Sequence, residues 1–171
     1  MVKRYEKGRR AEYELRDKLR SYGFYNVRRG SVLHGTQDVF NLLGIHIEVK
    51  MHAKIDISTW LSQSIASAEK RQDGLPVIMY RQADKTHRGL PWLVTMRLED
   101  WWRIGGADFF AVTRSVGIYE RMKRASEAGQ KAVIDHLSVG SVVSMYLDDW
   151  IELYGNWKLP FTEDDDVPSG D

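Results

Sequence analysis

The chain has 171 residues, 43% of them hydrophobic, which suits one domain with a substantial core. It contains no cysteine, so disulfides and cysteine-ligated zinc sites are excluded. No apolar run approaches the roughly 20 residues of a membrane-spanning helix, and the charged N-terminus is followed by no apolar signal segment. We therefore expect a cytoplasmic protein that has no membrane partner.

The charges are unevenly distributed, although the net charge is only +1. Residues 1–124 contain 23 Lys and Arg against 14 Asp and Glu, whereas residues 125–171 contain 2 against 10. A basic body favours a polyanionic partner. An uneven but merely solvated surface explains the same charge distribution equally well.

The first predicted element is a helix over residues 4–22. Ala11, Leu15 and Leu19 recur at helical spacing, with Arg and Lys on the other faces. Gly23 is a natural end for this helix.

Three strands are predicted next, over residues 24–29, 38–43 and 45–51, with a turn at Gly44 between the last two. In the third strand, apolar side chains alternate with polar ones, which predicts one buried face. The polar face carries His46, Glu48 and Lys50.

A helix that Asp56 or Ser58 can cap follows the third strand. Two further strands over 77–81 and 92–97 and a short helix over 98–104 complete an α-β-β-β-α-β-β order. This order predicts an α/β fold in which helices flank a central mixed sheet.

Residues 105–160, after the Gly105–Gly106 break, are predicted to form a mainly helical extension of the 1–104 core, with helices at about 117–136 and 141–154. Residues 161–171 form an acidic tail that we expect to be disordered.

The chemistry is predicted to centre on Asp38, Glu48 and Lys50. Residues 48 and 50 point to the same side of a strand, and a tight turn at Gly44 would bring Asp38 level with Glu48. Two carboxylates meeting in this way are typical Mg²⁺ ligands. A surface ion pair on a solvated strand explains most isolated Glu-x-Lys triplets. The interpretation as a metal site therefore depends on the context of these residues, a predicted hairpin flanked by two helices.

In that context the chain resembles the PD-(D/E)xK nuclease superfamily, and within it the archaeal-type Holliday junction resolvases and related phage enzymes. The resemblance covers about residues 3–104. It rests on the order of several short matches: Lys7-Gly8, Glu12, Gly23-Phe24, Arg28, Gly30-Ser31, Asp38 and Glu48-Val49-Lys50. The chain departs from the family in having Gln37 where Pro precedes the Asp, in the short Asp-to-Glu spacing, and in lacking a counterpart for 105–171.

The resemblance implies a restriction-endonuclease-like core (α-β-β-β-α-β) and a Mg²⁺-dependent endodeoxyribonuclease, with Mn²⁺ as a substitute and no small-molecule cofactor. Asp38, Glu48 and the Val49 carbonyl would hold the metal, and Glu12 would assist as an additional metal-site carboxylate. Lys50 would act on the attacking water or the phosphorane. It also implies a homodimer that resolves four-way DNA junctions by paired nicks, in the host cytoplasm if phage-encoded. The expected DNA-binding residues are Lys7, Arg9, Arg10, Arg28, Arg29, Ser31 and Gln63.

Three other functions fit the same residues. A flap, mismatch or restriction-like nuclease would share the metal site, a catalytically silent DNA-binding protein would share the fold, and a protein-interaction module would use the C-terminal extension. For His46, a packed position without a catalytic role is a simpler interpretation than a supporting role at the site. Of the adjacent Trp101 and Trp102, at least one indole is expected to face solvent or a partner.

Overall fold

The computed structural model describes residues 2–30, 38–83, 90–107 and 116–158. The first half of the chain forms α1 (Val2–Ser21), β1 (Arg28–Arg29), β2 (Val39–Phe40), β3 (Ile45–His52), α2 (Ile57–Arg71) and β4 (Leu75–Gln82). The second half forms β5 (Leu93–Arg97), α3 (Leu98–Arg103), α4 (Ile118–Glu127), β6 (Ala132–Leu137), β7 (Gly140–Tyr146) and α5 (Leu147–Lys158).

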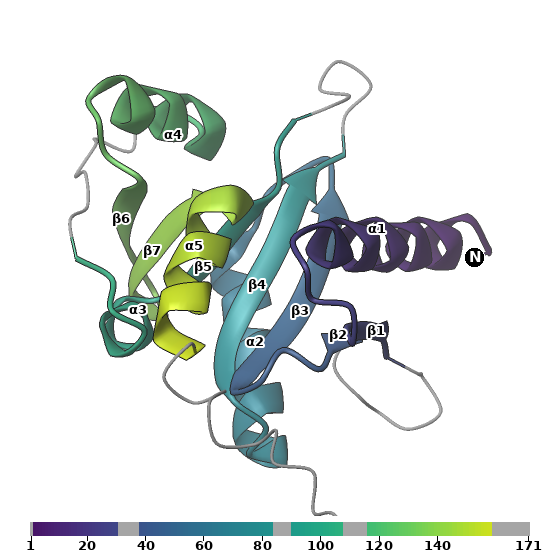
Figure 1. Ribbon diagram of the computed structural model, residues 1–171. Helices are drawn as coiled ribbons and strands as arrows, with labels where there is room; N and C mark the ends of the chain where they lie inside the picture. The colour runs from purple at the N-terminus through teal and green to yellow at the C-terminus, as the bar shows by residue number, and fades with distance from the viewer. Residues whose placement is uncertain (1, 31–37, 84–89, 108–115, 159–171) are drawn as a thin grey trace, which may run out of the picture.

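The described strands build one seven-stranded sheet in the order β1-β2-β3-β4-β5-β7-β6. Strands β3 and β4 pair in parallel through the α2 crossover, and the other neighbouring strands pair antiparallel. The sheet is therefore mixed, and helices flank it, as the sequence predicted (Figure 1).

Helices cover both faces of this sheet. α1 and α5 lie together on one face, where the Tyr22 hydroxyl donates to Asp148 and residues of both helices line one groove. The start of α2 and the start of α4 lie together on the other face, where they line a second groove. The core between these layers is apolar, with Leu15, Ile47 and Trp150 fully buried.

The N-terminal elements follow their sequence signals closely. Ala11, Leu15 and Leu19 are buried along α1, and Gly23 ends the helix with a φ of 99°. Asp56 caps α2 by accepting a hydrogen bond from the Thr59 backbone N–H at 3.2 Å. The strands predicted over 24–29 and 38–43 shorten to two residues each, so β1 and β2 form a small ribbon at the sheet edge.

The mainly helical extension predicted for 105–160 was wrong. Among the residues that the structure describes there, 105–107 and 116–158, only α4 and α5 are helical, and residues 132–146 form a hairpin instead of helical segments. β7 pairs with β5 along five residues, so this region continues the core sheet. β-Branched Val142 and Val143 favour a strand, and a two-residue loop before Gly140 closes the hairpin.

Gly74 holds the start of β4 close to the start of β3. A Cβ at this position would lie 2.5 Å from the Gly44 carbonyl carbon, and φ is 139°, a conformation that only glycine adopts readily. The Leu75 N–H donates to the Gly44 carbonyl at 2.8 Å. The contact fixes where the parallel pair begins, and therefore where Glu48 and Lys50 lie relative to β4.

No helix in the described part of the chain is long and apolar enough to cross a membrane. The predicted acidic tail, 161–171, lies outside the described residues.

Candidate functional site

The predicted carboxylate pair lies where β2 meets β3. Val39 pairs with Ile47 in the antiparallel register, which sets Asp38 opposite Glu48 one residue further along. The prediction that a tight turn near Gly44 makes Asp38 and Glu48 level is therefore confirmed. Gly44 has the positive φ, 74°, that this turn requires.

Asp38 is fixed by the backbone of β3. Its Oδ2 accepts a hydrogen bond from the Val49 N–H at 2.8 Å, one residue beyond Glu48 on β3. The N–H and C=O of a strand residue point toward the same neighbouring strand. The Val49 carbonyl therefore faces the Asp38 side of β3, as a third oxygen at this position.

Lys50 lies beside Glu48 on the same side of β3. Its Nζ donates to Glu48 Oε1 at 2.6 Å, and the two side chains are only 16% and 21% exposed. Half-burial separates this pair from the exposed ion pairs that most Glu-x-Lys triplets make. The ammonium is held within reach of anything that Glu48 binds.

Glu12 joins the site from α1. Arg29 of β1 donates through Nε to Glu12 Oε2, and both side chains are less than a fifth exposed. Burial raises the pKa of Glu12 despite the opposing effect of Arg29, and the Glu48 charge raises it further. Glu12 is therefore close enough to Glu48 for the two carboxylates to repel each other.

The pKa of Asp38 is perturbed more strongly than that of Glu12. Burial, followed by the Glu48 charge, raises the pKa of Asp38 to about 7, with a smaller contribution from Glu12. The Val49 N–H and the Lys50 ammonium act in the opposite direction. The carboxyl groups are therefore crowded and partly buried, and the nearby positive charge does not offset their mutual repulsion. A bound cation would relieve that repulsion.

These donors suit one hard cation and not a closed protein cage. Among the described residues, no group of three or more His, Asp or Glu side chains converges closely enough to hold a metal ion by itself. Mg²⁺, however, is commonly held by one or two carboxylates, with water and substrate phosphate as the remaining ligands. Asp38, Glu48 and the Val49 carbonyl meet that requirement with oxygen donors alone.

Only some of the predicted DNA-binding residues lie at the site in the described part of the chain. Arg29 lies at the site in its contact with Glu12, whereas its neighbour Arg28 is exposed, as strand alternation requires. Arg10 is exposed and pairs with Glu14 on α1. Gln63 is exposed on α2, and no contact places it at the site. Ser31 and the side chain of Lys7 lie outside the described residues.

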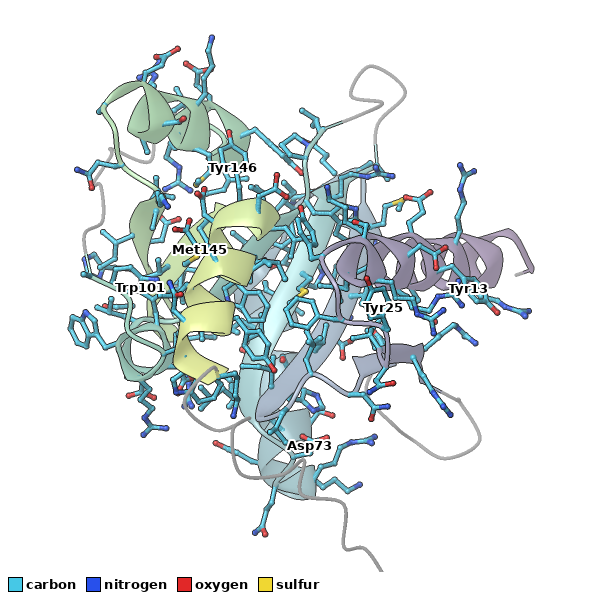
Figure 2. The ribbon with its side chains drawn as sticks, in the orientation of Figure 1. Tyr13, Tyr25, Asp73, Trp101, Met145 and Tyr146 are labelled. Atoms are coloured by element: carbon cyan, nitrogen blue, oxygen red, sulfur yellow. The ribbon has the colours of Figure 1, made fainter. Side chains whose placement is uncertain are left out.

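Two arrangements near the site were missed by sequence reasoning. His46 is fully buried on the Glu48 side of β3, and its Nδ1 lies 2.7 Å from Asp73 Oδ1, in the turn after α2 (Figure 2). This contact confirms His46 as a packed residue but adds a partner 27 residues away. Tyr13 on α1 lies against Arg29 and two helix arginines. The helical part of that cluster is visible in the sequence as spacings of four and three residues.

Other predictions concern residues away from the site. Trp101 is buried and Trp102 is 56% exposed, so one indole of the pair does face solvent. Glu14 of α1 accepts a hydrogen bond from Arg81 of β4 at 2.6 Å and another from Arg10.

Comparisons with protein-family models, with curated protein sequences and with solved structures give no match.

Proposed function

We propose that this chain is a metal-dependent endodeoxyribonuclease with a PD-(D/E)xK active site at the β2–β3 junction. The observation that carries the proposal is the opposition of Asp38 and Glu48 across neighbouring strands, with the Val49 backbone bonded to Asp38 and Lys50 bonded to Glu48. The α1-β1-β2-β3-α2-β4 order agrees with a restriction-endonuclease-like core.

Each residue has a distinct role in this proposal. Asp38, Glu48 and the Val49 carbonyl would hold Mg²⁺, or Mn²⁺ in its place. A cation held there would activate water for attack and neutralise charge on the phosphate. Lys50, which is already held within hydrogen-bond distance of Glu48, would donate to the attacking water or to the phosphorane oxygens.

Glu12 supports the site from the α1 side. Its carboxylate adds negative charge near Glu48, and Arg29 sets its orientation. Hydrolysis would join the water oxygen to phosphorus and break one P–O bond of the backbone, leaving a nick. The chain's own groups bind the phosphate, position the water and hold the proton donors in place.

The proposed substrate is a four-way DNA junction, and this selectivity rests on the resemblance to junction resolvases. A two-fold symmetric homodimer would supply one site per chain and cut opposing strands in pairs. Recognition would depend on phosphates and on DNA shape, with the basic residues near the site contacting the backbone and not base edges.

The test is cleavage of a labelled four-way junction with Mg²⁺, beside matched duplex, flap and splayed substrates. The expected result is paired symmetric nicks in the junction, absent in Glu48→Gln and retained in Glu127→Gln, which changes an exposed glutamate on α4. Equal cleavage of all substrates would retain the nuclease and refute junction selectivity. Junction binding without cleavage of any substrate would favour the silent DNA-binding protein.

A further inference from the structure

Four side chains converge beside the candidate site. Arg9, Tyr13 and Arg16 are four and three residues apart, so they share one face of α1. Arg29 reaches the same ring from β1. The guanidinium carbons lie 4.8 Å from the Tyr13 ring centroid for Arg16, 5.4 Å for Arg29 and 5.8 Å for Arg9. Figure 2 shows Tyr13 on α1, on the side of the helix where β1 lies.

Arg16 and Arg29 each contact a carboxylate as well as the Tyr13 ring, whereas Arg9 contacts both the ring and the hydroxyl of Tyr13. Arg9 hydrogen-bonds the Tyr13 hydroxyl, and this bond is the main reason that the pKa of Tyr13 is lowered. Arg16 donates to Asp17 through Nε at 2.8 Å, and Arg29 donates to Glu12. Three guanidinium groups therefore gather around one ring, and two of them also donate to a carboxylate.

We propose that Tyr13 holds Arg9, Arg16 and Arg29 as a clamp for a DNA backbone phosphate next to the one at Asp38 and Glu48. The ring attracts the guanidinium groups. Each guanidinium has five N–H donors in a rigid fork, and only some of these are used by Glu12 or Asp17. The remaining donors can bind phosphate oxygens in pairs, the geometry in which Arg recognises phosphate most strongly.

A phosphate fits this cluster better than a stacked base does. Base stacking needs an open aromatic face, whereas guanidinium groups already surround the Tyr13 ring. The position of the clamp follows from Arg29, which touches both the Tyr13 ring and the Glu12 carboxylate. The assignment to the neighbouring phosphate rests on the proposed function, and the presence of the clamp itself does not.

The test measures DNA binding in EDTA, so that cleavage plays no part. Fluorescence anisotropy of a labelled duplex is followed between about 50 and 200 mM salt, because each lost phosphate contact lowers the slope of log affinity against log salt by about 0.9. Tyr13→Leu removes the ring, and Tyr13→Phe removes only the hydroxyl. Tyr25→Leu is the matched control, because Tyr25 is 78% exposed and lies in the turn after α1.

Tyr13→Leu is expected to weaken binding about tenfold at the lower salt. It should also reduce the slope by about 0.9 or more, the amount that corresponds to one lost phosphate contact. Tyr13→Phe should lose less, and Tyr25→Leu should bind as wild type does. Wild-type affinity and slope in Tyr13→Leu would overturn the clamp, as would failure of the wild-type chain to bind DNA. Equal losses in the Leu and Phe variants would overturn the ring-held arrangement.

The outcome is independent of nuclease activity. Weaker binding by Tyr13→Leu in a chain that cleaves no DNA would support the clamp and refute the nuclease. Unchanged binding in a chain that cleaves DNA would do the reverse.

Discussion

Asp38→Asn removes one negative charge from the crowded carboxylate site while keeping the size of the side chain. The amide oxygen can still accept the hydrogen bond that Asp38 accepts from the Val49 N–H at 2.8 Å. Since burial and Glu48 raise the pKa of Asp38 from 3.8 to about 7, ionised Asp38 destabilises the metal-free fold. At a pH below 3.8, Asp38 is protonated in both the folded and the unfolded chain and costs no stability. As the pH rises through 7, Asp38 ionises in the folded chain and this stability is lost.

A shift of this size corresponds to at most about 4 kcal/mol, since one pKa unit equals about 1.4 kcal/mol. Structural relaxation reduces it, so we expect the stability advantage of Asp38→Asn over wild type to grow by about 2 kcal/mol between about pH 5 and pH 8.5. Urea unfolding in EDTA at the two pH values measures this difference. Asp17→Asn, an exposed carboxylate on α1, is the control, with an expected change below about 0.5 kcal/mol.

A loss of stability in Asp38→Asn that is the same at both pH values would refute the electrostatic reasoning. Added Mg²⁺ should stabilise wild type and leave Asp38→Asn unchanged, because ligand binding to the folded state alone raises its stability.

Three further predictions concern the fold and the site. Gly74→Ala should cost at least about 2 kcal/mol in thermal or urea unfolding, because its Cβ would meet the Gly44 backbone at a strained φ; unchanged stability would contradict the close approach. Asp135→Asn should cost about 3–5 kcal/mol, since it strands the buried Arg121 charge that lies 2.7 Å from Asp135 Oδ2. The exposed control Glu120→Gln should cost less than about 1 kcal/mol, and equal costs would contradict the burial argument. Glu12→Gln should lower the cleavage rate while leaving DNA affinity within about twofold, because it removes charge from the site and not a phosphate donor; a parallel loss of affinity would contradict that role.

Local signals predicted the N-terminal half of the fold. The apolar stripe of α1 and the alternation in β3 are properties of short windows, and burial on one face turns each into an element. The Gly44 turn then determines the register that sets Asp38 opposite Glu48. The central pair of the candidate site could be predicted for that reason.

The C-terminal half could not be predicted in the same way. Val143, Tyr146, Leu147, Trp150 and Tyr154 fall at helical spacing, but only the residues from Leu147 onward are helical. The preceding strand is stabilised by pairing with β5, about 50 residues earlier in the chain. Such pairing depends on tertiary context, which overrides local periodicity.

The site shows the same division. Arg9, Tyr13 and Arg16 are related by helix spacing, but nothing in the sequence connects them with Arg29 until β1 folds beside α1. The Asp73 partner of His46 likewise becomes apparent only when the turn after α2 returns to the start of β3.

The most direct test of the proposed metal site is Mn²⁺ binding to the purified chain, followed by calorimetry or by the electron paramagnetic resonance signal of free Mn²⁺. We predict a Mn²⁺ site in wild type that Mg²⁺ displaces, that is lost in Glu48→Gln and that is retained in Glu127→Gln. Binding that is absent from wild type, or that survives unchanged in Glu48→Gln, would contradict a metal site built from Asp38, Glu48 and the Val49 carbonyl.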